Sequence, residues 1–273
     1  HRYSRTNGRH RRTRKDEAAM AGDTHSVSIG DDDLLPPWST VFDVVRATDA
    51  NDWVLVGGLM VQLHARRAGI PPPRATKDVD LVVDVAANSA SVARMAIALK
   101  RIGFEPIVPA NRKEPIYRFQ RDAEQVDLMV ADHLPARLKP RFMMRPAFAV
   151  TAGEQSLRRR DTFVLTSTTR SVTLGAPDVL GALIGKGAAY IVDSRDPGRH
   201  LDDAAALLAS IDSVGDLDLS ALNANDRKRL VAVARALRDV THPAWLTLDD
   251  NQRAKARRNL EALVTAAPLD LRT

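Results

Sequence analysis

The sequence contains no cysteine, only three Trp, three Tyr and six Phe among 273 residues, and no long apolar run. Without cysteine, disulfides and thiolate metal sites are excluded. No apolar stretch approaches the roughly 20 residues of a membrane helix, and no basic stretch leads into an apolar one as in a secretory signal. We therefore expect a cytoplasmic protein that does not associate with membranes.

The formal charge of +6 is concentrated at one end of the chain. Residues 1–19 hold seven of the 40 basic and two of the 34 acidic residues, which leaves 33 and 32 for the remainder. Almost no apolar residue lies in this tail, which predicts disorder. Because Met20 opens an ordinary-looking stretch, we expect residues 1–19 to be non-native sequence without a role. Residues 1–37 as a whole are predicted to be a disordered or polar N-terminal segment.

Apolar periodicity and the Gly and Pro positions predict an α+β protein. Residues 38–174 are expected to form a mixed sheet with flanking helices, and residues 175–273 a helical domain. Strands are expected at 53–58, 78–85, 116–119, 125–130 and twice within 161–174. Helices are expected at 38–50, 59–69, 89–102, 177–192, 200–211, 220–239 and 250–266.

Two carboxylates stand one residue apart in an otherwise apolar strand, Asp78 and Asp80. Side chains at positions i and i+2 of a strand share a face, with Cα atoms roughly 6.6 Å apart, so both can bind one divalent ion. Mg²⁺ prefers such oxygen ligands. Asp127 lies among apolar neighbours in another predicted strand. If that strand is adjacent, Asp127 would be a third ligand or the base for an attacking hydroxyl.

A structural role is the alternative for these aspartates, at strand ends or paired with arginines. For Asp84 or Asp127 taken alone, that alternative is favoured. For Asp78 and Asp80 together, the cost of placing two carboxylates on one buried face favours a metal site.

A Gly-Gly pair, Gly57 and Gly58, ends the strand that precedes the carboxylates. A helix that starts there leaves free backbone N–H groups, which favour a phosphate, and glycine allows close approach. Nineteen residues separate Gly58 from Asp78. That length accommodates one helix and a return loop, so the two strands can lie side by side.

The stretches "VGGLMVQLHA" and "RATKDVDLVVD" resemble the core of the nucleotidyltransferase superfamily that includes polymerase β. The resemblance is strongest to the AbiEii-type toxins of bacterial toxin–antitoxin pairs, including the mycobacterial group that modifies tRNA. It continues through "AGEQSLRR", "GAPDVLGALIGKGAAY" and "RDPGRHLDDAAALLA" and spans roughly residues 40 to 210.

The resemblance implies a metal-dependent transfer of a nucleoside monophosphate from an NTP, with Mg²⁺ or Mn²⁺ as cofactor. By position it assigns the nucleotide phosphates to Gly57, Gly58 and Lys186, the metal to Asp78, Asp80 and Asp127, and catalytic roles to Asp78, Asp80, Lys186 and Asp203. Asp202 is the alternative to Asp203.

Lys186 lies in an apolar segment where an unpaired cation is costly and a triphosphate would satisfy it. The alternative is a lysine that snorkels to water. Around Asp203, the neighbouring Arg195 and His200 fit helix capping and ion pairing as well as catalysis. His64 is expected to be a packed core histidine.

The implied acceptor is RNA, with a tRNA end favoured because few aromatics are available to stack long single strands. The implied partners are the NTP, this RNA and an antitoxin. The alternatives are a small-molecule acceptor such as an aminoglycoside, a protein hydroxyl, or a non-catalytic nucleotide- or RNA-binding protein. Candidate RNA contacts are Arg112, Lys113, Arg118, Arg121, Arg137, Lys139, Arg141, Arg145, Arg158, Arg159 and Arg160.

Overall fold

A computed structural model describes residues 22–271, apart from the side chains of Asp33 and Arg137. The predictions for residues 1–19 lie outside the described residues. Within them the α-helices are α1 (Trp38–Ala47), α2 (Gly57–Arg67), α3 (Ser91–Arg101), α4 (Gly153–Arg158), α5 (Val179–Val192), α6 (Gly198–Ser210), α7 (Ala224–Leu237) and α8 (Asp250–Ala266). Short 3₁₀ turns occupy Asp32–Leu34, Ala50–Asp52, Ala136–Leu138, Val214–Asp216 and Pro243–Thr247.

The larger sheet has the strand order β2-β3-β6-β5-β4, and β9 also pairs with β6. Its strands are β2 (Trp53–Val56), β3 (Asp78–Val83), β4 (Glu105–Pro106), β5 (Arg118–Arg121), β6 (Glu124–Ala131) and β9 (Phe148–Val150). β3 runs parallel to β6 and antiparallel to β2, so the sheet is mixed.

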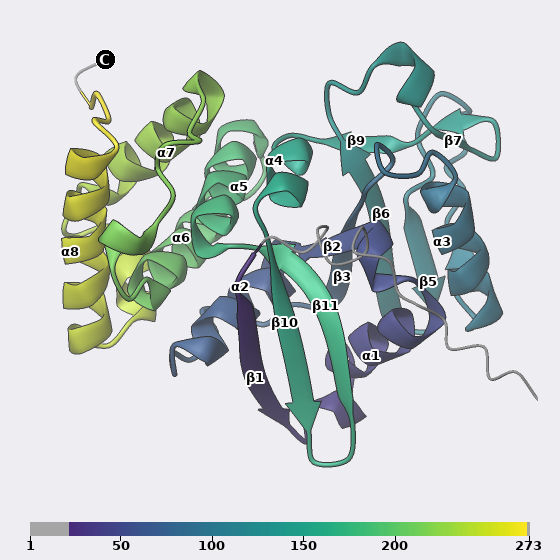
Figure 1. The fold of residues 1–273 in the computed structure, drawn as a ribbon, viewed down its shortest axis with the longest axis horizontal. Helices are drawn as coiled ribbons and strands as arrows, with labels where there is room; N and C mark the ends of the chain where they lie inside the picture. Colours follow the sequence, from purple (N-terminus) through teal and green to yellow (C-terminus); the bar gives the residue numbers. More distant parts are fainter. Residues whose placement is uncertain (1–21, 272–273) are drawn as a thin grey trace, which may run out of the picture.

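The smaller sheet joins β1 (Thr24–Gly30), β10 (Arg160–Ser167) and β11 (Ser171–Pro177), and it packs beside β2 through β11. A separate hairpin is formed by β7 (Arg141–Phe142) and β8 (Arg145–Pro146). Figure 1 shows the helices α5 to α8 gathered on one side of the two sheets, with α1 and α3 on the other side. The α+β class, the mixed sheet and the helical second half are therefore confirmed.

The two faces of the larger sheet are packed differently. Alternate residues of β3, such as Leu81 and Val83, face the main core, which includes Phe42 of α1 and Leu99 of α3. The opposite face carries Asp78, Asp80, Val82, Asp127 and Met129, and we call it the carboxylate face. A small apolar cluster around Val82 and Met129 packs there against Leu157 of α4. The carboxylates therefore continue a partly covered apolar surface.

The expectation of a polar lead-in is wrong for residues 24–30. They form β1, which pairs in parallel with β10 and buries Val27 and Ile29. Only every second residue of this strand is apolar, and the exposed positions are Thr, Ser and Gly. The strand is stabilised by its neighbour in the sheet, a partner that the local composition does not reveal.

Candidate active site

Three carboxylates meet on the carboxylate face. Asp80 of β3 stands opposite Asp127 in the parallel pairing with β6, and Asp78 lies two residues earlier on the same side of β3. One oxygen from each carboxylate lies within 4.8 Å of the others. Asp78 and Asp80 are half-buried and Asp127 is buried. The expectation that Asp127 lies in the strand next to Asp78 and Asp80 is therefore confirmed.

The charges of this carboxylate triad are balanced only at Asp127, which pairs with Arg118, and within residues 22–271 neither Asp78 nor Asp80 forms an ion pair. Burial and the nearby carboxylates of Asp78 and Asp127 together raise the pKa of Asp80 to about 7. A divalent cation bound by the three aspartates would remove this repulsion, and an all-oxygen donor set fits Mg²⁺ or Mn²⁺. The residues present therefore fit the expected metal.

The glycine turn lies directly against the triad. Gly57 begins α2 with φ +71°, and a Cβ atom at this position would lie 1.9 Å from Oδ2 of Asp80. A Cβ on Gly58 would lie 2.8 Å from Oγ1 of Thr76, which donates to Asp78 at 3.1 Å. Two successive positions without side chains thus let Asp80 and Thr76 lie directly against the start of α2. A helix start of this kind presents free N–H groups to an anion.

Two cations converge on Asp203 next to this turn. Arg74 donates to both oxygens of Asp203, at 3.1 and 3.0 Å, and Nζ of Lys186 lies 2.7 Å from Oδ2. Burial alone would raise the pKa of Asp203, but Lys186 and Arg74 outweigh it, and the pKa lies below its usual range. Two cations and one anion leave a net positive charge. The Arg74 guanidinium lies 3.3 Å from a Cβ built on Gly58.

The two neighbouring aspartates of α6 lie in different surroundings. Asp203 is 1% exposed and pairs with both cations, whereas Asp202 is half-buried and burial raises its pKa. His200 is not part of this cluster, because its Nε2 lies 3.0 Å from Asp193. His64 is a buried core histidine as expected, with Nε2 2.9 Å from the Pro177 carbonyl.

Arg118 pairs with Asp127 through two hydrogen bonds, at 3.0 and 2.8 Å. Despite this partner, burial raises the pKa of Asp127. Arg118 and Arg74 are the two site cations that the sequence reasoning did not place at the carboxylates. Arg118 could have been found from the hairpin register, which sets it opposite Asp127. Arg74 follows three prolines and carries no pattern of its own.

Only some of the candidate RNA contacts expected from the sequence are free of partners among the residues that the structure describes. Arg121 is paired with Asp43 and Glu124. Arg159 pairs with Asp178, and Arg160 donates to the carbonyls of residues 50 and 51. The side chain of Arg137 lies outside the described part.

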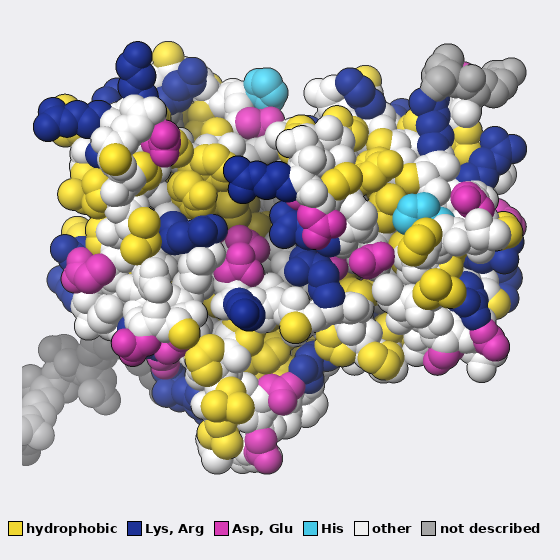
Figure 2. Space-filling model, turned by 180° about the vertical axis from the view of Figure 1, so that it is seen from behind, with side chains coloured by type: hydrophobic (Ala, Val, Ile, Leu, Met, Phe, Trp, Pro, Cys, Tyr) yellow, Lys and Arg dark blue, Asp and Glu magenta, His cyan; other side chains and the backbone are white. Residues whose placement is uncertain are grey.

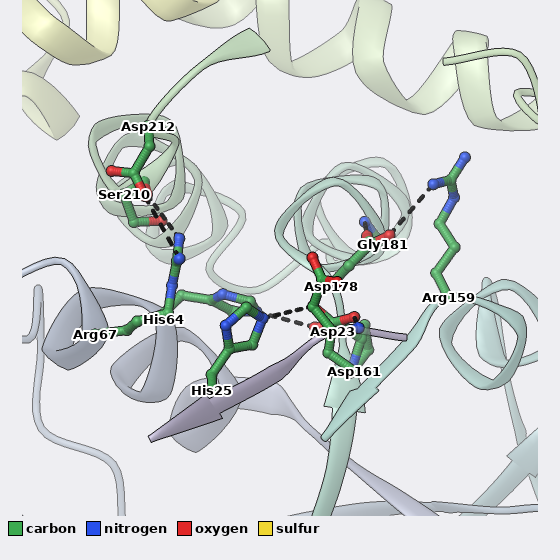
Figure 3. A network of polar contacts seen from close by, with 11 residues as sticks. Asp23, His25, His64, Arg67, Arg159, Asp161, Asp178, Gly181, Ser210 and Asp212 are labelled. Carbon is green, nitrogen blue, oxygen red and sulfur yellow. Dashed lines mark hydrogen bonds and ion pairs between the residues drawn. The ribbon is translucent and has the colours of Figure 1, made fainter. Parts of the chain in front are cut away.

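Arg158, Arg159 and Arg160 line a separate cleft of about 990 Å³. Figure 3 shows part of the polar network around it, in which His25 contacts Asp161 at 2.9 Å and Arg67 of α2 reaches the Ser210 carbonyl of α6. Aspartates outnumber the arginines in the lining. This cleft is therefore not a uniformly basic surface.

Comparison with known proteins gives a distant likeness. No protein-family model matches the sequence, and no curated protein matches it. Among solved structures, the chain is similar to an antigenic nucleotidyltransferase-like protein from Paracoccidioides brasiliensis, at 18% sequence identity and a TM-score of 0.40. The match covers 84% of this chain and 88% of that one. At these values the likeness carries no argument about activity.

Proposed function

We propose that the protein transfers a nucleoside monophosphate from an NTP to a hydroxyl group of an RNA acceptor. The observation that carries the proposal is the meeting of three carboxylates with a helix start formed by two glycines, against which the Asp80 carboxylate lies directly. The carboxylates suit a metal that binds phosphate oxygens, and the helix start suits the phosphates themselves. Both features serve one substrate, a nucleoside triphosphate.

In this reaction the acceptor oxygen forms a bond to the α-phosphorus while the bond from that phosphorus to pyrophosphate breaks. The proposal assigns Asp127 to accept the hydroxyl proton, and burial, which raises the pKa of this carboxyl group, supports that role. Asp78, Asp80 and Asp127 would hold Mg²⁺, which when bound stabilises negative charge on the phosphates and the leaving group.

Two cations of the chain complete the part of the site that would bind the phosphates. Arg74 and Lys186 share Asp203, so their net positive charge can face the triphosphate near Gly58. Asp203 then acts as a positioning residue that fixes both cations.

The resemblance to AbiEii-type toxins favours tRNA as acceptor and a role as the toxin of a toxin–antitoxin pair. Small-molecule and protein hydroxyls are the other outcomes of the test below.

The test is incubation of purified protein with Mg²⁺, total bacterial RNA and each α-labelled NTP in turn. We expect label on a tRNA-sized band with wild type, loss of at least 100-fold with Asp80→Asn, and near wild-type labelling with Asp84→Asn. Asp84 is a matched control, because it follows β3 outside the triad and accepts from Ala86 and Ala87. Absence of labelled RNA with every NTP would overturn the RNA acceptor. If label appears instead on a protein or an aminoglycoside added to the same reaction, that acceptor would replace RNA in the proposal.

A further inference from the structure

The strand order divides the surroundings of the triad into two sides. β2, which leads into Gly57 and α2, flanks β3 on one side. β5 and β9 both pair with the opposite edge of β6, beyond Asp127. Phosphate-binding features therefore lie at one end of the row of carboxylates, and a different set of residues lies at the other end. An acceptor that attacks in line must approach from the side away from the leaving group.

An aromatic pair lies on that second side. The rings of Tyr117 and Phe148 are stacked, with centroids 4.5 Å apart and planes inclined by 25°. Phe148 pairs with Met129 and packs on the carboxylate face, and both rings are only half-buried. The Arg118 guanidinium lies 5.5 Å from the Tyr117 ring and also binds Asp127. A flat aromatic surface thus lies one residue from a side chain that contacts the triad.

The β7–β8 hairpin lies immediately before Phe148 in the chain. Its two turn residues, Met143 and Met144, have φ +49° and +64° and are 57% and 81% exposed. Glycine or asparagine usually fills such positions, because a side chain with positive φ is strained. The turn therefore holds two apolar side chains in solvent at a cost. Phe148 is four positions after Met144, a reach of at most about 14 Å.

The β7–β8 hairpin, the residues just before it and the loop at residues 109–114 that Arg145 contacts carry positive charge without a matching negative charge. Five cations lie there, and Glu114 is the single carboxylate among them. Within residues 22–271 none of the five forms an ion pair. They are Arg112, Lys113, Lys139, Arg141 and Arg145. Arg145 donates only to the carbonyls of Pro109, Asn111 and Glu114. Figure 2 shows Lys and Arg beside apolar side chains at its upper left, the edge at which Figure 1 places β7.

We infer that the Tyr117–Phe148 pair and the β7–β8 hairpin form the acceptor site and hold the single-stranded 3′ end of an RNA. The aromatic pair stacks a terminal base, the hairpin cations bind the backbone phosphates, and the methionines contact the next bases. The identity of the acceptor rests on the proposed function. One aromatic pair and one short hairpin suit one or two unpaired nucleotides on a folded RNA.

The test measures RNA binding without catalysis. A 5′-labelled RNA hairpin with a four-nucleotide 3′ overhang and its blunt counterpart are titrated by fluorescence anisotropy in EDTA without NTP. Wild type should prefer the overhang. Tyr117→Ala should lower the affinity for the overhang RNA about tenfold and leave blunt binding unchanged, since stacking of one base is lost. Tyr117→Phe and Tyr190→Ala should bind as wild type.

The cations are tested by salt dependence. Lys139→Gln and Arg141→Gln should each lower the slope of log affinity against log salt by about 0.7, and Arg258→Gln on α8 should not. Tyr117→Leu keeps the apolar volume without the ring and replaces Tyr117→Ala if that variant unfolds.

Equal binding of both RNAs by wild type, or no effect of removing the Tyr117 ring, would overturn the inference. It would also be overturned if Tyr117→Ala weakened NTP binding and not RNA binding. Overhang-dependent binding without nucleotide transfer would refute the proposed function alone. Transfer that survives Tyr117→Ala at unchanged RNA affinity would refute the acceptor site alone.

Discussion

Gly57 touches the triad more directly than any pattern in the sequence suggests, since a methyl group there would overlap the Asp80 carboxylate. We predict that Gly57→Ala lowers nucleotidyl transfer at least 100-fold. Gly69→Ala is the matched control, because Gly69 has a similar φ of +67° but open space around its Cβ. Both variants carry the strain of a positive φ, roughly 1 to 2 kcal/mol. Equal activities of the two variants would show that the contact with Asp80 is unimportant.

Asp80 should weaken the fold in the absence of metal. Its pKa is about 7 in the folded state, above the ordinary carboxyl value of 3.8. Between pH 4 and 7 the folded state therefore binds more protons than the unfolded state, and this residue lowers stability as pH rises. Asp80→Asn should raise the free energy of unfolding by on the order of 2 to 4 kcal/mol at pH 8 in EDTA.

Denaturant titration of both proteins at pH 4, 6 and 8 measures this effect. The gain should vanish at pH 4 and shrink when Mg²⁺ is added, because the wild-type carboxylate then has a counterion. A variant no more stable than wild type at pH 8 would contradict the raised pKa.

The predictable part of the site is the part set by short-range spacing. Asp78 and Asp80 share a face because strand side chains alternate, and Gly57 and Gly58 stand where a strand gives way to a helix. The partners of these residues were not predictable in the same way. Arg118 reaches Asp127 through cross-strand register, and Arg74 reaches Asp203 from a loop without periodicity.

At the level of elements, Asp203 joins α6 to α5 and to the loop before β3. Asp203→Asn would leave the buried Lys186 without a carboxylate partner. Loss of one member of a buried pair costs about 3 to 5 kcal/mol, so we predict a marked fall in melting temperature. Asp202→Asn, one residue away on the same helix, should change stability by less than about 1 kcal/mol. Calorimetry on both variants measures the difference.

A second substitution distinguishes lost pairing from general disruption of α6. Adding Lys186→Met to Asp203→Asn removes the unpaired cation and should recover part of the stability. Additive losses would indicate that the two residues act independently.

Long periodic elements were predicted well and short ones were not. The expected helix at 250–266 coincides with α8, whose start is fixed by the Asp249–Gln252 capping box. The strand β1 and the six-residue α4 were absent from the expected elements. α4 is too short for a clear period, β1 has only two apolar residues among seven, and both are stabilised by neighbours distant in the chain.

At the scale of the whole molecule, His64 connects α2 to the smaller sheet through the Pro177 carbonyl at the end of β11, directly before the helical half. Burial lowers the pKa of His64 from 6.5 to about 4. Its contribution to stability is therefore present above pH 6.5 and is lost as pH falls from 6.5 to 4, by about 3 kcal/mol. We predict one cooperative unfolding transition, to whose free energy His64 makes this pH-dependent contribution.

His64→Gln keeps an N–H donor but does not titrate, so the stability difference between wild type and variant should shrink as pH falls through this window. The difference is the quantity to measure, because Asp80 acts in the opposite direction over the same pH range. Two separate transitions in calorimetry would show that the halves unfold independently.

The link between Arg74 and Asp203 spans 129 positions of the chain and also sets the timing of assembly. A growing chain that has emerged as far as β6 already contains Asp78, Asp80 and Asp127, but neither Lys186 nor Asp203. At about 5 to 20 residues per second, several seconds of synthesis pass before α6 follows. The carboxylate triad and Arg74 thus precede Lys186 and Asp203 on the ribosome, and nascent or prematurely ended chains lack both Lys186 and the carboxylate that holds Arg74.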